Sequence, residues 1–206
     1  MDRFEVNVQT LPIVNGSRLN PSDFLNYIRL NINNFINTDI ATFVPYLEPS
    51  HGINDNIKWA SNDPLGTMLH IKMDDNGSVI LSDHAPDHWT VSTIRTPMDG
   101  NHPVTGNRSW GYKANPNGSF TFYVTGADRL TAPAHQIAQA LFGIPFSGAD
   151  KLWMSFQNKL SDFINAHQGN ANVGSVTTER PDYAALKDYF DGKITIEQLK
   201  AKGACI

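Results

Sequence analysis

The chain has 206 residues, of which 40% are hydrophobic and 17% are charged, and its net charge at pH 7 is −4. This length and composition predict one packed, soluble domain rather than a disordered chain. No run of Lys or Arg supplies the basic stripe with which proteins bind nucleic acids or anionic membranes, so we expect neither partner.

Two further absences bear on location and redox chemistry. The sequence contains no signal peptide and no apolar run approaching about 18 residues. We therefore expect synthesis in the cytoplasm, no membrane span, and export, if it occurs, by an apparatus that needs no N-terminal signal. Cys205 is the only cysteine, which excludes an intramolecular disulfide and a cysteine-based zinc site.

The first elements are a strand and a helix. Residues 4–14 alternate enough between apolar and polar to predict a strand. Asn20 is a favourable N-cap and Pro21 fits the first helical position. Apolar residues then recur every three or four positions, which predicts one helix extending to about Ile36.

The middle of the chain predicts a sheet. Residues 45–64 are rich in Pro, Gly and Asp and predict an irregular loop pinned by Tyr46 and Trp59. After this loop, alternating stretches joined by turn-forming residues predict an antiparallel meander of four to six strands, at 67–73, 78–82, 88–96, 108–113 and 119–125.

The last third predicts helices. We expect a short helix at 133–142 and a longer one capped by Asp150 that ends near His167. The domain would then end at residue 168, followed by a linker at 169–180 and a small helical hairpin at 181–206. The expected fold class is α+β, with the antiparallel meander packed against helices.

The segment from His102 to Arg108 is the most distinctive candidate site. Pro103 and Gly106 predict a tight turn that brings the imidazole and the guanidinium together. An Arg fork beside a His could hold a carboxylate or phosphate, with His102 and Arg108 as the catalytic pair. The ligand-binding candidates around them are Arg95, Trp110, Tyr123, Asp128 and Arg129.

These residues also have structural interpretations. Arg108 could pair with Asp99 or Asp128 while His102 bonds to the backbone, which would fasten the ends of the meander. Trp110, like most aromatic residues on a sheet, could belong to the core.

The pattern Asp83-His84-x-x-Asp87-His88 raises the possibility of a divalent-metal cofactor. His84 and His88 would be ligands, with His102 as a third, because imidazole and carboxylate suit zinc and similar ions. The pattern matches no established zinc motif, however, and these residues could simply be loop histidines beside turn-forming aspartates. No nucleophile elbow, P-loop, dinucleotide-binding turn or zinc-protease helix occurs in the sequence.

Residues 96–131 (TPMDGNHPVTGNRSWGYKANPNGSFTFYVTGADRLT) carry a resemblance. They resemble an uncharacterised bacterial domain family with the signature His-Pro-Val-[Ser/Thr]-Gly-Asn-Arg followed by Gly-[Ala/Val]-Asp-Arg. Thr105 replaces the usual Ser, and Val124 stands where Arg is common. The family is found near effector systems of the Rhs and contractile-injection type, and it implies no established activity.

Three functions follow from the sequence. The resemblance implies a cargo, toxin or effector protein associated with a secretion or injection apparatus, whose components would be its partners. The His102–Arg108 segment predicts a hydrolase-like or lyase-like enzyme. The polar, Asn-rich surface and its aromatic residues favour a non-catalytic binding module.

Overall fold

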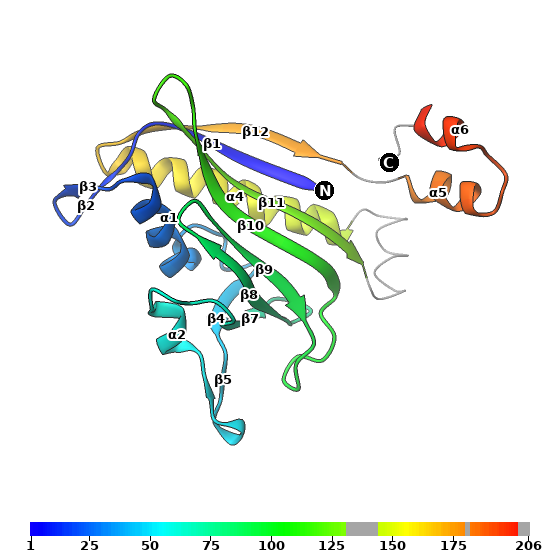
Figure 1. Ribbon diagram of the computed structural model, residues 1–206, viewed down its shortest axis with the longest axis horizontal. Helices are drawn as coiled ribbons and strands as arrows, with labels where there is room; N and C mark the ends of the chain where they lie inside the picture. The colour runs from blue at the N-terminus through cyan, green and yellow to red at the C-terminus, as the bar shows by residue number, and fades with distance from the viewer. Residues whose placement is uncertain (131–143, 180–181, 202–206) are drawn as a thin grey trace.

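The computed structural model describes residues 1–130, 144–179 and 182–201. Its centre is an antiparallel sheet of eight strands in the order β12-β1-β11-β10-β9-β8-β7-β4 (Figure 1). The strands are β1 (Asp2–Thr10), β4 (Thr42–Pro45), β7 (Met68–Lys72), β8 (Gly77–Ala85), β9 (His88–Ile94), β10 (Val104–Ala114), β11 (Phe120–Leu130) and β12 (Asn170–Thr178). The predicted α+β class is confirmed, but the sheet is larger than the four to six strands expected.

The remaining elements are short strands and helices. Two small hairpins, β2 (Ile13–Val14) with β3 (Ser17–Arg18) and β5 (Leu47–Glu48) with β6 (Ile53–Asn54), stand apart from the main sheet. The described helices are α1 (Pro21–Leu30), α2 (Asn56–Ala60), α4 (Ile144–Ala166), α5 (Tyr183–Phe190) and α6 (Ile196–Ala201), with 3-10 turns at Ile32–Asn34 and Pro49–His51. None of the described helices is long and apolar enough to cross a membrane.

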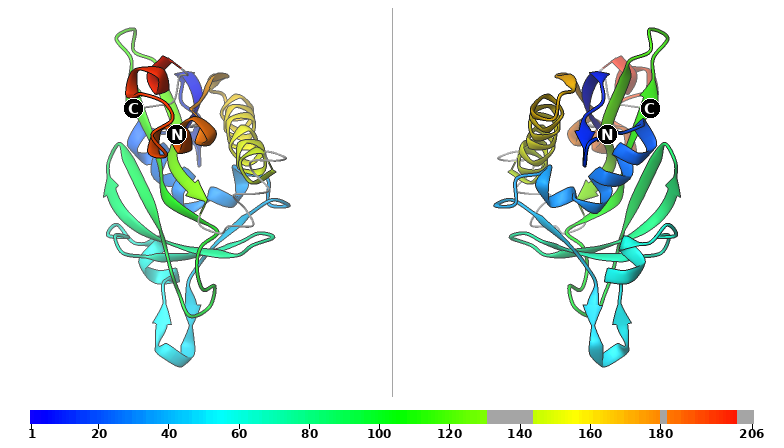
Figure 2. Two further views of the ribbon diagram at one scale, coloured as in Figure 1. Left: turned by 90° about the vertical axis from the view of Figure 1, so that its right-hand side faces the viewer. Right: turned by 90° about the vertical axis from the view of Figure 1, so that its left-hand side faces the viewer.

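One face of the sheet, called the inner face here, packs against α1 and α4. Phe24 of α1 meets Phe122 of β11 at a ring-centroid distance of 5.3 Å. Trp153 of α4 meets Trp110 of β10 at 5.5 Å. Figure 1 and Figure 2 show both helices on the same side of the curved sheet. Because every second residue of a strand points to one face, the opposite, outer face carries the polar residues between these apolar ones.

The start of the first helix is confirmed, but its predicted end is wrong. Asn20 accepts a hydrogen bond from the backbone N–H of Asp23 at 2.8 Å, as an N-cap does. The helix ends at Leu30, where the side chain of Asn31 bonds back to the carbonyl of Tyr27. Asn33 pairs with the backbone of a later strand instead of continuing the helix. These amide side chains compete with the helical hydrogen bonds, so the apolar spacing alone overestimates the helix length.

Several other boundaries differ from the predictions. Residues 45–64 are a hairpin and the helix α2 rather than one irregular loop, although Tyr46 and Trp59 are buried as expected. The strand β8 continues through the predicted loop as far as Ala85. Asp150 lies inside α4 and not at its N-cap, because the helix already begins at Ile144. The helix predicted at 133–142 lies outside the described residues.

The predicted linker is the largest error. Residues 170–178 form β12, which pairs with β1 at the edge of the main sheet. An edge strand has one neighbour and exposes most of its side chains, so its Asn, Gly, Ser and Thr residues give no apolar pattern. After it, α5 and α6 pack against each other through Ala185 and Leu199. The two expected terminal helices are therefore present among the described residues.

Candidate functional site

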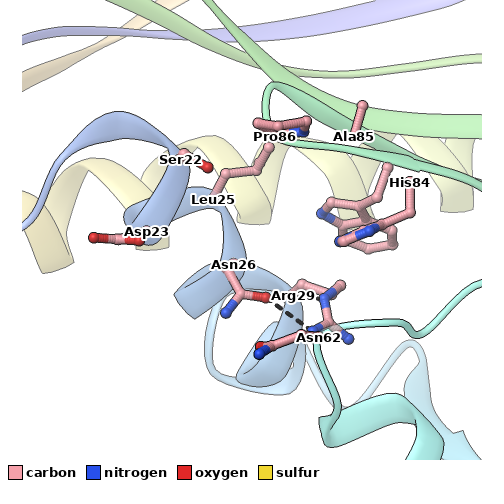
Figure 3. Close-up of a pocket in the computed structure, with 10 residues that line it drawn as sticks. Ser22, Asp23, Leu25, Asn26, Arg29, Asn62, His84, Ala85 and Pro86 are labelled. Carbon is pink, nitrogen blue, oxygen red and sulfur yellow. Dashed lines mark hydrogen bonds between the residues drawn. The ribbon is translucent and has the colours of Figure 1, made fainter.

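A pocket lies between α1, the turn of the β8–β9 hairpin and the segment that follows α2 (Figure 3). Its volume is about 370 Å³, which is within the range of small-ligand sites. The buried side chains of Leu25, Arg29 and Trp89 contribute to its lining. The other lining residues are Ser22, Asp23, Asn26, Asn62, His84, Ala85 and Pro86.

Arg29 is the unusual member of this pocket, because within the described part of the chain this buried cation is held only by neutral groups. Its side chain donates to the carbonyls of Trp59 and Ser61 and, through Nη2 at 2.8 Å, to Oδ1 of Asn26. Its Cζ lies 4.8 Å from the centre of the Trp59 ring. Among the described residues, no carboxylate forms an ion pair with it.

The charge of Arg29 persists despite this environment. The residue is only 1% exposed. Burial lowers the pKa of its guanidinium to about 10, which leaves it protonated at neutral pH. Because a buried charge without a counter-ion is unfavourable, an anion in the pocket would stabilise this arrangement.

Two further residues that line the pocket, Trp89 and His84, carry ring N–H groups. The indole Nε1 of Trp89 is buried and has no acceptor among the described residues. The imidazole of His84 is half-buried, and burial followed by the charge of Arg29 lowers its pKa. His84 is therefore mainly neutral at pH 7, with one ring N–H and one ring lone pair.

The predictions from the sequence did not include Arg29, although its position in the apolar stripe is unusual for a charged residue. Leu25, Ile32 and Ile36 lie on the apolar stripe of the predicted helix, and Arg29 falls in the same stripe at helical spacing. A charged residue on a buried helix face needs compensation, which makes such a position a candidate site. The predicted sites were instead chosen from the polar residues of the meander.

Arg108 has a buried structural environment. Its Nη1 donates to Oδ1 of Asp2 at 2.7 Å, and its Nη2 donates to Oδ2 of Asp128 at 2.5 Å. Its Cζ also lies 4.6 Å from the centre of the Trp153 ring. Burial acts to lower the pKa of Arg108, but the two carboxylates outweigh it and raise the pKa. The expected pairing of Arg108 with Asp128 is confirmed, whereas Asp99 lies elsewhere.

His102 and Arg108 do not share a tight turn. Gly106 lies within β10, where it passes close to the backbone of Ala127 and the side chain of Asp128. The four steps from Val104 to Arg108 advance along the strand by about 13 Å. His102 precedes the strand, packs on Gly77, and accepts the backbone N–H of Val104 through Nδ1 at 3.2 Å. This is the hydrogen bond to the backbone that we expected if His102 has a structural role.

The two predicted metal ligands lie on opposite faces of the β8–β9 hairpin. His84 pairs in register with Trp89, and His88 pairs with Ala85, one position further along. The two ring nitrogens of His88 lie 2.8 Å from carboxylate oxygens of Asp83 and Asp87. Among the described residues, no group of three or more His, Cys, Asp or Glu is arranged to hold a metal ion.

The other predicted ligand residues are dispersed. Trp110 is in the core, stacked on Trp89 with ring centroids 3.9 Å apart. Tyr123 lies on the outer face, with Cζ of Arg3 3.9 Å from its ring centre. Arg95 and Arg129 are exposed, and neither lines the pocket.

A polar cluster beneath the β9–β10 loop was also absent from the sequence predictions. His70 Nδ1 donates to Oδ2 of Asp99 at 2.8 Å, and the hydroxyl of Ser78 donates to the same oxygen. The Thr96 hydroxyl lies 2.9 Å from that of Ser78. His70 and Ser78 are neighbours in the register of β7 and β8, and Asp99 comes from the loop. This cluster therefore fastens the loop to the outer face of the sheet.

Comparisons with known proteins add no assignment for this site. No protein-family model matches the chain, and no curated protein is significantly similar to it in sequence.

Proposed function

We propose that this protein binds a small anion with an apolar body in the pocket at Arg29. The observation that carries the proposal is the buried guanidinium of Arg29, which has neutral hydrogen-bond partners and no carboxylate partner among the described residues. A carboxylate, sulfonate or phosphate group would supply the missing negative charge.

The hydrogen-bonding capacity of the pocket supports an acceptor-rich ligand. A guanidinium has five N–H groups, and Arg29 makes four hydrogen bonds within the described residues, two of them to Oδ1 of Asn26 through Nε and Nη2. One N–H is therefore left for a ligand among the described groups. Trp89, which lines the pocket, has a second N–H without an acceptor among the described residues. Both donors would be satisfied by the oxygens of one anionic group.

The apolar part of the lining supports a ligand with a hydrocarbon or aromatic body. Leu25, Ala85 and Pro86 contribute carbon surface. Figure 3 shows Leu25 and Pro86 at one end of the pocket and Arg29, Asn62 and His84 at the other. A ligand would therefore place its charged group near Arg29 and its apolar body toward the hairpin turn.

The side chains favour binding over catalysis. Within the described part of the chain, no hydrogen bond joins His84 to Ser22 or to Asp23, so the pocket has no coupled nucleophile and base. Asp23 is instead bonded to Asn20 at the helix cap.

Binding can be tested with benzenesulfonate, benzoate and inorganic phosphate by following the indole N–H signals in ¹H–¹⁵N NMR. We expect the Trp89 signal, assigned with a Trp89→Phe variant, to shift on titration. Arg29→Met should weaken binding at least about tenfold, which corresponds to about 1.4 kcal/mol. Arg95→Met, which removes an exposed arginine outside the pocket, should bind normally.

Arg29 also holds the carbonyls of Trp59 and Ser61, so its replacement could unfold the protein. Asn62→Phe provides a second test because it fills the exposed rim and leaves Arg29 in place. We expect this variant to fold and to lose binding. Equal affinity of Asn62→Phe, Arg95→Met and the unaltered protein, or no binding of any probe, would overturn the proposal.

We also propose a biological setting for this binding protein, namely cargo or effector of a bacterial secretion or contractile injection apparatus. The resemblance of residues 96–131 supports this setting. Mass spectrometry of purified injection particles and the identity of the neighbouring genes test it. Absence of the protein from the particles, together with neighbours that encode no sheath, tube, spike or toxin, would contradict it.

A further inference from the structure

We infer that His84 is a second, titratable cation of the Arg29 pocket, so that anion binding takes up a proton and strengthens as the pH falls. The inference rests on the proposed anion-binding function. It makes His84 the residue that determines how much negative charge the pocket accepts.

The geometry of the hairpin directs His84 into the pocket. His84 pairs in register with Trp89, so both side chains point to the same face of the β8–β9 hairpin. Trp89 is part of the core, and both residues line the pocket. Figure 3 shows the imidazole of His84 and the guanidinium of Arg29 approaching the same space from β8 and α1.

Without a bound anion, the surroundings of His84 disfavour its protonated form. Burial lowers its pKa below the ordinary value of 6.5, and the positive charges of Arg29 and then His88 act in the same direction. Asp63 and Asp83 act against this, but the pKa remains lowered. A neutral His84 therefore faces the permanent charge of Arg29 at neutral pH.

One further carboxylate lines the pocket. Asp23, in the first turn of α1, is exposed, and its Oδ2 accepts the side-chain amide of Asn20 at 2.6 Å. The carboxylate of Asp23 is thus hydrogen-bonded at the helix cap. The field that His84 experiences inside the pocket is dominated by Arg29 and its own burial.

An anion placed between the two groups would reverse the electrostatic balance. It would cancel part of the repulsion from Arg29 and attract the imidazolium, so the pKa of His84 rises on binding. Affinity would then increase as the pH falls through the pKa that His84 has with the anion bound. It would level off below the pKa that His84 has without the anion. Each unit by which binding raises this pKa contributes about tenfold in affinity between the two limits.

A second histidine of the same hairpin, His88, provides a control for His84. Hydrogen bonds to Asp83 and then Asp87 raise the pKa of His88 above its ordinary value, so the hairpin contains a second titratable imidazole. His88 lies on the other face of the hairpin and does not line the pocket. Replacing it should change the hairpin without removing proton uptake by the ligand site.

Isothermal titration calorimetry with benzenesulfonate tests the inference, because the charge of this probe is constant over the relevant range. Between about pH 8 and about pH 5, we expect affinity to rise about tenfold. In buffers with different ionisation enthalpies, the binding heats should reveal proton uptake. His84→Asn should bind with little pH dependence, and His88→Gln should retain the dependence of the unaltered protein.

The possible failures are distinguishable. Arg29-dependent binding with equal affinity and no proton uptake across this range would overturn the role of His84 and leave the anion site standing. Absence of Arg29-dependent binding at every pH would overturn both. If His84→Asn fails to fold, the His84 Cε1–H signal of the unaltered protein provides the measurement. Its midpoint must move to higher pH when benzenesulfonate is added, and an unchanged midpoint overturns the inference.

Discussion

Arg108 and Asp2, 106 positions apart in the chain, form a two-point ion pair on the inner face of the sheet. Nη1 and Nη2 of Arg108 lie 2.7 and 3.0 Å from Oδ1 and Oδ2 of Asp2. The two residues belong to strands separated by β11, which contributes Asp128 to the same guanidinium. This contact therefore ties together three adjacent strands.

We expect Asp2→Asn to lower the free energy of unfolding by about 1–3 kcal/mol, because a buried charged hydrogen bond loses its charge. Arg108→Met should cost more, about 3–5 kcal/mol, since it leaves two carboxylates close together without a cation. Urea denaturation measures both. Arg3→Met, on the outer face and paired with Glu5, is the control and should cost less than about 1 kcal/mol. Equal stability of the Asp2 and Arg3 variants would contradict the structural role.

Gly126 makes room for this ion pair. A Cβ on Gly126 would overlap the guanidinium of Arg108. Gly126→Ala should therefore destabilise the protein by about 1–3 kcal/mol, because the buried fork must shift away from its carboxylates. Gly148→Ala is the matched control, since no described residue lies within 4 Å of a Cβ at that position of α4. In a thermal melt we expect the control to be unchanged or slightly more stable.

His88 should make the stability of the β8–β9 hairpin depend on pH. Hydrogen bonds to Asp83 and then Asp87 raise its folded-state pKa above 6.5. Its stabilising contribution is thus fully present below the unfolded value of 6.5 and is lost as the pH rises through the folded-state pKa. The urea midpoint of the unaltered protein should exceed that of His88→Gln at about pH 6, and the difference should shrink by about pH 9. A difference that grows with pH would be inconsistent with this arrangement.

Asp99 should control the order of the β9–β10 loop. Its carboxylate accepts from His70 and Ser78, which are buried with it beneath the loop. Asp99→Ala should cost about 1–3 kcal/mol, because the ring N–H of His70 loses its acceptor and the Ser78 hydroxyl keeps only that of Thr96. Hydrogen exchange measures the local effect at the amide of Gly100, which donates to the carbonyl of Thr96 at 2.8 Å. Unchanged exchange there would show that the cluster does not fasten the loop.

The candidate site was harder to predict than the fold, because its contacts join segments that are distant in the sequence. The pairing of Arg108 with Asp128 was among the predictions, because both lie near the ends of strands joined by one hairpin. The contribution of Asp2 depends on β1 returning beside β11, which no local pattern specifies. The binding pocket likewise needs α1, the hairpin and the segment after α2 to meet, and these are separated by tens of residues.

The sequence by itself determined the class of the fold, the cap at Asn20 and the central strands. These features follow from local chemistry, namely an amide oxygen at a helix start, residues alternating between two faces, and turn-forming residues between strands. The tertiary structure decided that 170–178 is an edge strand, that His84 and His88 face opposite ways, and that Arg29 is buried in a pocket. Strand pairing and the enclosure of a charge depend on contacts between segments distant in sequence, so only the assembled chain specifies them.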